Sequence, residues 1–256
     1  MLYRTFDLYE NCHNDYVDLD NNFHELEAMS EAFRQEILNS VFGNNTAVTI
    51  IYYTNFSRNQ QVITLSVHYE KYNASHFSKY PYWSNETLES AIDYITFNES
   101  IIEHIVETVE NQTQSKEELA NALLDFVQDK QHGLSIRYYP TSELKYPIET
   151  LVEMGGDCDA HAFLYGALMK TAGFKVLILL SQEEIEGQHH VAVAVHLENP
   201  PENSRPDMRN KNFTYNGEIY YYAETTMWCS RVGDIPSVLE NLTFFLIPVS
   251  NQQSLY

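Results

Sequence analysis

Basic residues are scarce in this sequence, which has 15 Lys and Arg against 36 Asp and Glu and a formal net charge of -21. Such a charge repels nucleic-acid phosphates and anionic lipid headgroups over most of the surface. We therefore expect no nucleic-acid partner. Long apolar runs are absent too, because the longest, at 176–180 and 244–249, have the length of buried strands rather than the roughly 18–20 residues that span a bilayer.

Cysteine is also rare, with residues only at Cys12, Cys158 and Cys229. Three scattered cysteines cannot build a disulfide framework, and their odd number leaves at least one thiol outside any pair. If Cys158 keeps its thiol, Cys12 and Cys229 either pair with each other or are two separate thiols. With 256 residues and 44% hydrophobic content, the chain can bury one substantial core without cross-links.

Glycosylation acceptor triplets, Asn-X-Ser/Thr, are abundant by contrast. Eight occur, where composition alone predicts about three. The excess is typical of an exported glycoprotein, although an Asn-rich composition also produces such triplets. Residues 1–34 contain no apolar signal-peptide core, so we expect any targeting segment or membrane anchor to lie outside this chain, as in an excised ectodomain. The predicted location is extracellular or at the cell surface. The triplets begin at Asn44, Asn55, Asn73, Asn85, Asn98, Asn111, Asn212 and Asn241.

Hydrophobic periodicity divides the chain into an N-terminal extension, residues 1–80, and a main domain, residues 81–256. In the extension, apolar residues at helical spacing predict a helix over 21–42. Two runs of β-branched and aromatic residues at 47–53 and 61–69 predict a β-hairpin. We expect the helix and hairpin to be an appendage of the main domain.

The main domain places helices before strands. The second predicted helix opens with a capping box formed by Ser115 and Glu118. Pro, Asn and charged residues in segment 198–217 predict a solvent-facing loop. The predicted elements are helices at 98–110, 115–129 and 158–172 and strands at 174–180, 190–197 and 219–226.

Two glycines and Asp157 immediately precede Cys158, which opens a predicted helix. At a helix N-terminus, unpaired backbone N–H groups and the positive end of the helix dipole favour a thiolate. The same N–H groups can also serve an oxyanion. Cys158 is therefore a candidate nucleophile.

The strand that begins at residue 190 alternates small and branched residues. His190, Ala192, Ala194 and His196 share one face, and Val191, Val193, Val195 and Leu197 share the other. We expect the alanine face to let the helix that carries Cys158 pack closely, bringing its thiol to His190. His189 belongs to the valine face, which predicts a structural role for it.

An acidic partner for His190 follows from strand pairing. If 190–197 and 217–224 form an antiparallel hairpin centred on Asp207, His190 lies directly opposite Glu224. The Cβ atoms would then be about 4.5–5.5 Å apart, so the carboxylate can accept the imidazole N–H and orient the ring. Cys158, His190 and Glu224 together predict a nucleophile, a base and an orienting acid.

Each of these residues also has an ordinary structural interpretation: a small buried cysteine, a packed histidine and a solvated strand carboxylate. Their combination favours the catalytic interpretation. A metal site is an alternative, since Cys158-X-X-His161 lies near Asp157, His189 and His190, but the sequence lacks a second Cys-X-X-Cys or His-X-X-X-His element. We expect neither a metal nor a cofactor.

These residues resemble the transglutaminase-like superfamily, in which a Gly-X-Cys helix start is followed by a His-led strand and an acid on the next strand. The strings YPIETLVEMGGDCDAHAFLYGALMKTAGFKVLIL, HHVAVAVHL and YYYAETT are most similar to the transglutaminase-like cysteine proteases of prokaryotes, above all archaea. The resemblance covers residues 83–248. It assigns the three roles, in the same order, to Cys158, His190 and Glu224.

The resemblance implies an α+β fold with a papain-like core, in which the cysteine helix packs on an antiparallel sheet. It also implies a side-chain oxyanion donor, for which Gln128 is the candidate because it ends the preceding helix. Two residues depart from the family pattern. Many homologues have an acidic residue in place of His161, and the third triad member is commonly Asp rather than Glu224.

The function implied is thiol-dependent chemistry on an amide bond of a protein or peptide substrate, as a peptidase or amidase that forms an acyl-enzyme. Protein cross-linking is an alternative, but it needs a site that favours an amine over abundant water, and the sequence indicates none. A non-catalytic surface binding module with the same fold is the other alternative.

Overall fold

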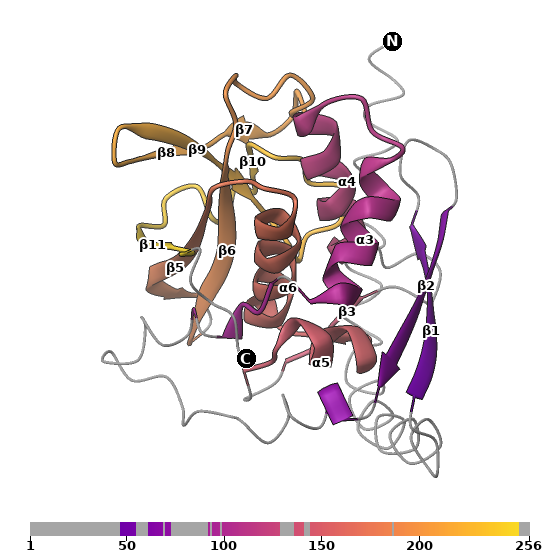
Figure 1. The fold of residues 1–256 in the computed structure, drawn as a ribbon. Helices are drawn as coiled ribbons and strands as arrows, with labels where there is room; N and C mark the ends of the chain where they lie inside the picture. The colour runs from indigo at the N-terminus through magenta and orange to yellow at the C-terminus, as the bar shows by residue number, and fades with distance from the viewer. Residues whose placement is uncertain are drawn as a thin grey trace.

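The computed structural model describes residues 47–54, 61–68, 70–72, 92, 94–97, 99–128, 136–140, 144–185 and 187–250. Within them the chain has a mixed α+β fold, in which helix α6 (Cys158–Thr171) packs on a curled five-stranded antiparallel sheet (Figure 1). The predicted helix at 21–42 lies outside the described residues. The boundary at residue 80 stays a prediction, because 73–91 lie outside them as well.

The five-stranded sheet has the order β11-β5-β6-β9-β8, and every neighbouring pair is antiparallel. The three strands predicted after the cysteine helix are confirmed as its central strands. The prediction that 198–217 is only a loop is wrong, since it contains β7 (Arg209–Asn210) and the edge strand β8, where half-buried Phe213 and Tyr215 alternate with exposed residues. The strands are β5 (Val176–Ile185), β6 (Gln188–His196), β8 (Asn212–Tyr215), β9 (Glu218–Ala223) and β11 (Phe244–Pro248).

The two faces of β6 pack differently from the prediction. Its valine face shares a core with α6, whereas Ala192 and Ala194 belong to a second apolar cluster on the other face, with Tyr222 and Phe244. The expectation that the helix covers the alanine face is therefore wrong. Valines offer α6 more apolar area, and the alanines leave room for the large rings on the opposite face.

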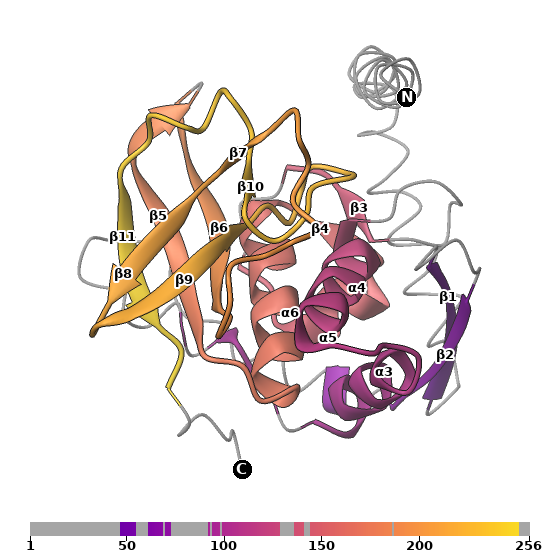
Figure 2. The ribbon, with the colours of Figure 1, turned by 90° about the horizontal axis from the view of Figure 1, so that it is seen from above.

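Helix α6 lies between the sheet and the helices α3 (Ser100–Glu110) and α4 (Lys116–Gln128), as Figure 2 shows from above. All its residues from 159 to 169 are buried, which fits a central helix. Half of the predicted capping box of α4 is present: Glu118 N donates to Ser115 Oγ at 3.1 Å, but Glu118 Oε2 accepts from the backbone N of Gln114, at 2.7 Å, rather than from that of Ser115. A short helix, α5 (Pro147–Val152), follows.

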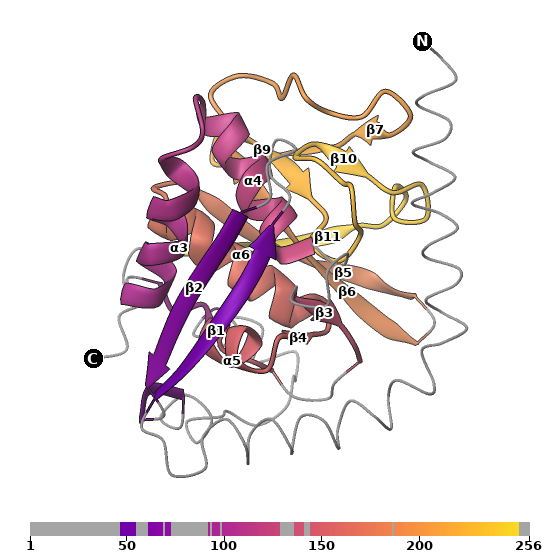
Figure 3. The same cartoon turned by 90° about the vertical axis from the view of Figure 1, so that its right-hand side faces the viewer.

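The predicted hairpin is confirmed as β1 (Ala47–Thr54) paired antiparallel with β2 (Gln61–His68). It lies over α3 on the side away from the sheet (Figure 3). Ile63, Leu65 and Val67 of β2 share one core with the helices. Two small ladders complete the fold: β3 (Arg137–Tyr138) runs parallel to β4 (Gly155–Gly156), and β7 (Arg209–Asn210) is antiparallel to β10 (Asp234–Ile235).

Candidate active site

Cys158 is the first residue of α6, and the turn before it is fixed by close backbone packing. Asp157 caps the helix, its side chain accepting from Ala160 N at 3.5 Å. A Cβ at Gly155 would overlap the carbonyl oxygen of Arg137, and one at Gly156 would overlap the side chain of Ala160. Gly155 is therefore required for the close β3–β4 contact, and Gly156 for the close approach of this turn to α6.

Lys145 supports the same turn from inside the protein. Only 1% of its side chain is exposed, and Nζ donates to the carbonyl oxygen of Gly155 and pairs with Glu153, each at 2.9 Å. Burial lowers the pKa of Lys145, but Glu153 and Tyr139 outweigh it, so the pKa is raised from its ordinary value and the ammonium persists. Tyr72, which follows β2, donates to Glu153 at 2.8 Å and joins the extension to this network.

His190 and Glu224 are in direct contact across the sheet. Nε2 of the imidazole lies 2.9 Å from Oε2 of the carboxylate, and the two side chains are 14% and 1% exposed. The register pairs Val193 with Ala223, which differs by two residues from the predicted hairpin and makes Glu224 a diagonal neighbour of His190. The predicted register is wrong, but an even shift keeps both residues on the same face.

The carboxylate of Glu224 is held at both oxygens. Oε1 accepts from the backbone N of Thr226 at 3.0 Å and from its Oγ1 at 2.7 Å, while Oε2 also accepts from the hydroxyl of Tyr222 at 2.6 Å. Burial alone would raise the pKa of Glu224, but His190 and these donors lower it to about 2. Glu224 is therefore an anion over the whole physiological range.

The thiol of Cys158 completes the group. It lies beside the imidazole of His190, and Sγ donates to the backbone carbonyl oxygen of His189 at 4.0 Å. Burial lowers the pKa of His190, but Glu224 and Cys158 together raise it to about 10. The imidazole is therefore an imidazolium at neutral pH, beside a half-buried thiol. The structure thus brings Cys158, His190 and Glu224 together.

His189 turns away from this group. Its Nδ1 lies 2.9 Å from the carbonyl oxygen of Ser181, its Nε2 lies 3.9 Å from Glu184, and its side chain is 49% exposed. The opposite direction of His190 is fixed by a bulge in β5, where Ser181 Oγ accepts from His190 N at 2.7 Å.

Gln128 is fully buried beside Glu224, where its amide donates to the backbone carbonyl oxygen of that residue. The interaction holds the end of the strand that carries the acid. Its role as an oxyanion donor stays a prediction, since in the described part of the chain its amide donates to Glu224 rather than toward Cys158.

His161 is also buried, with Nδ1 at 3.3 Å from the carbonyl oxygen of Thr225 and Nε2 at 3.2 Å from that of Arg137. It thereby connects α6 to β3 and to the residue that follows Glu224. No three His, Cys, Asp or Glu side chains within the described ranges are grouped to hold a metal ion.

Sequence reasoning missed Tyr222 and Thr226, which flank Glu224 at two residues on either side. Their spacing is the signal that could have found them, because residues two apart on an extended chain share a face. It also missed Asp159, whose pKa is raised well above its ordinary value by burial and by the adjacent Asp157. Asp159 sits beside the thiol as a buried carboxyl.

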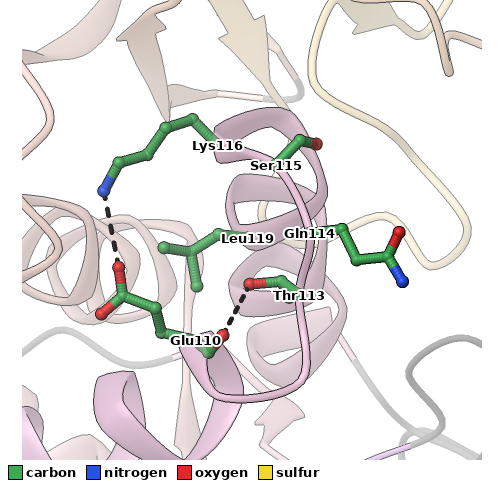
Figure 4. A pocket seen from close by; sticks show the side chains of 6 residues that line it. All are labelled: Glu110, Thr113, Gln114, Ser115, Lys116 and Leu119. Carbon is green, nitrogen blue, oxygen red and sulfur yellow. Dashed lines mark hydrogen bonds and ion pairs between the residues drawn. The ribbon is translucent and has the colours of Figure 1, made fainter.

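A surface pocket of about 240 Å³ lies at the connection between α3 and α4 (Figure 4). Lys116 in its wall donates to the carbonyl oxygen of Ala172 at 3.2 Å, at the C-terminal end of α6. Cys158 is at the other end of this helix, about 20 Å away by the helical rise. The pocket therefore does not belong to the candidate active site.

No family model, curated protein or solved structure matches this chain. The resemblance to the transglutaminase-like superfamily therefore rests on the motif residues themselves. Within the described part of the chain, no helix has the length and apolar character needed to cross a membrane.

Proposed function

We propose that this protein is a thiol-dependent amide-bond hydrolase of the transglutaminase-like superfamily with a papain-like core. The observation that supports it best is the His190–Glu224 pair, 2.9 Å apart, with the Cys158 thiol beside the imidazole at the start of α6. Nucleophile, base and orienting acid in contact are the arrangement that acyl transfer by a thiol requires.

In the first step the Cys158 thiolate attacks the carbonyl carbon of the amide. The C–N bond breaks, and the His190 imidazolium gives its proton to the departing amine or ammonia, leaving a thioester on Cys158. Because Nε2 is bonded to Glu224, Nδ1 is the nitrogen that serves the thiol and the leaving group. Backbone N–H groups at the start of α6 stabilise the negative oxygen of the tetrahedral intermediate.

In the second step neutral His190 takes a proton from water, and the resulting hydroxide attacks the thioester carbon. The C–S bond breaks, the carboxylic acid leaves, and the thiolate–imidazolium pair is restored. Glu224 remains an anion throughout and keeps the imidazole ring oriented and charged. A peptide or protein carboxamide is the substrate class that fits this sequence of steps.

The test is to trap and then resolve the acyl-enzyme. The protein is mixed with p-nitrophenyl acetate, and intact mass and peptide mapping are expected to show one acetyl group on Cys158. Release of amine or ammonia from a library of glutamine-containing peptides then measures turnover, and an added fluorescent alkylamine shows whether an amine replaces water.

Cys158→Ala is expected to abolish acylation and turnover, while the matched Cys229→Ala variant keeps both. Turnover that survives Cys158→Ala would overturn the proposed function, as would acetylation of Cys229 in place of Cys158. Incorporation of the alkylamine at the expense of hydrolysis would instead show a cross-linking acyltransferase.

We also propose an extracellular or cell-surface location, supported by the acceptor triplets. The three that fall within the described residues begin at Asn111, Asn212 and Asn241, and all three asparagines are exposed. The other five lie outside the described residues. Expression in a glycosylating secretory host, followed by glycosidase treatment and mass measurement, tests this location through the occupancy of these sites.

A further inference from the structure

Tyr222 shares one carboxylate oxygen with His190. Its hydroxyl donates to Glu224 Oε2 at 2.6 Å and lies 3.5 Å from His190 Nε2, so two donors meet at a single acceptor atom. The side chain is fully buried on the face of Ala194, its register partner in β6, and its ring packs against that of Phe244 with centroids 6.0 Å apart. Packing therefore fixes where the hydroxyl lies.

Tyr222 is not needed to orient the carboxylate of Glu224, because the other oxygen, Oε1, is held separately. Oε1 accepts two hydrogen bonds from Thr226, which already hold the plane of the carboxylate toward His190. The Tyr222 hydroxyl adds a second hydrogen bond to Oε2, which stabilises the negative charge on this oxygen. A donor that binds a carboxylate makes it a weaker base, and a weaker base holds the proton of a neighbouring imidazolium less tightly.

We propose that Tyr222 is a positioning residue that acts through Glu224, with its hydroxyl limiting how strongly the carboxylate retains the proton of His190. The inference rests on the proposed function. A general acid works best when its proton is not held too tightly at the working pH. Expulsion of an amide nitrogen needs that proton, whereas expulsion of a good leaving group such as p-nitrophenolate does not.

The hydroxyl of Tyr222 is suited to this role because it does not ionise. Burial and the neighbouring Glu224 raise the pKa of Tyr222 well above its ordinary value. It therefore remains a donor at every pH at which the protein works.

The test compares Tyr222→Phe with Tyr220→Phe, which removes the same hydroxyl two residues earlier on the same face. Tyr220 is also buried, but its hydroxyl lies 3.4 Å from Glu218 and away from the triad. Alkylation of Cys158 by iodoacetate is followed against pH, because this anionic reagent is attracted by the imidazolium and reacts more slowly once His190 loses its proton.

In Tyr222→Phe, the alkaline limb of the alkylation profile is expected to move up by about one pH unit, since Glu224 then retains the imidazolium proton more strongly. The ratio of amide to ester turnover is expected to fall about three- to tenfold. Tyr220→Phe is expected to match the wild type in both. Thr226→Val, which removes a donor to Oε1 rather than to the oxygen that faces His190, is expected to move the alkaline limb less than Tyr222→Phe does.

A Tyr222→Phe profile that superposes on the wild type would overturn the inference, and so would an equal shift in Tyr220→Phe. If Tyr222→Phe fails to fold, 3-fluorotyrosine at position 222 keeps the ring and makes the hydroxyl a stronger donor, so the alkaline limb is expected to move down; no shift overturns the inference. Because alkylation needs no substrate, absence of amide turnover in the wild type would count against the proposed function alone.

Discussion

His190 and Glu224 are diagonal neighbours across β6 and β9, with imidazole Nε2 2.9 Å from carboxylate Oε2. The register that pairs His196 with Tyr220, continued along β6, sets His190 opposite Thr226 rather than Glu224. Diagonal Cβ atoms are about 7–8 Å apart, against about 4.5–5.5 Å for residues directly opposed. The acid at this position must therefore have a longer reach than it would in a directly opposed pair.

We therefore predict that Glu224→Asp is not a conservative change. Shortening the side chain by one methylene withdraws the carboxylate from His190, and a misplacement of about 1 Å can lower turnover about 100-fold. The measurement is kcat/KM on an amide substrate for Glu224→Asp and Glu224→Gln, which are expected to fall to a similar level. An aspartate variant with most of the wild-type activity would show that the diagonal geometry does not demand glutamate.

The two adjacent histidines are expected to behave differently on mutation. His190→Ala removes the imidazole that contacts both Cys158 and Glu224 and should abolish turnover. His189→Ala removes a half-exposed side chain that contacts Ser181 and should leave turnover within about threefold of wild type. Amide hydrolysis by both variants, with circular dichroism as a check of folding, decides the matter. The reverse pattern would assign the base to His189.

Cys158 should be the thiol that reacts first. Cys158 lies at the N-terminus of α6 beside the His190 imidazole, the surroundings in which a thiol acts as a nucleophile, whereas Cys229 lies in a turn after β9. Iodoacetamide at pH 6–7 is therefore expected to label Cys158 at least about tenfold faster than Cys229, by peptide mass spectrometry. His190→Ala should remove most of this difference. The two alternatives for Cys12 and Cys229, a disulfide or two separate thiols, both stay open, because Cys12 lies outside the described residues.

The sequence predicts the three site residues through two signals, the alternation of residues along a strand and the helix-start motif before Cys158. Cys158, His190 and Glu224 could be grouped because alternation along a strand survives an even change of register. The register itself could not be predicted, because it depends on β7 and β8 in a segment whose composition is that of a loop.

The face of the sheet that α6 covers could not be predicted from the sequence either. Small residues at Ala192 and Ala194 accommodate either a helix or large rings, and only the positions of Tyr222 and Phe244 decide between them. Lys145 was missed because a charged side chain in a connecting segment gives no sign of burial until its partner Glu153 is placed.

The stability of the fold should vary with pH through the His190–Glu224 pair. The pKa of Glu224 is lowered from 4.5 to about 2, so its contribution is present above pH 4.5 and is lost as pH falls toward 2. The pKa of His190 is raised from 6.5 to about 10, so its contribution is present below pH 6.5 and is lost as pH rises toward 10. Urea unfolding across this range is expected to show greatest stability from about pH 4.5 to 6.5. Glu224→Gln should flatten both limbs.

Lys145 is expected to stabilise the turn before Cys158 through its buried ion pair with Glu153. Replacing Lys145 by Met leaves Glu153 as a buried charge without its cation, and breaking one side of a buried pair costs about 3–5 kcal/mol. Lys116→Met is the matched control, because its ion pair with Glu110 is more than half exposed on both sides and should contribute little. Urea unfolding of the two variants gives the difference in the free energy of unfolding.

The double variant Lys145→Met, Glu153→Gln separates charge from packing. Removing the stranded carboxylate should restore much of the lost stability, because the glutamine keeps a polar partner for Tyr72 without a buried charge. It should not restore the Nζ donor to the Gly155 carbonyl that fixes the turn before Cys158. The double variant is therefore expected to fold and yet to lose part of the selective alkylation of Cys158. Full recovery of both the stability and the selective alkylation would show that Lys145 contributes to stability only and not to the reactivity of Cys158.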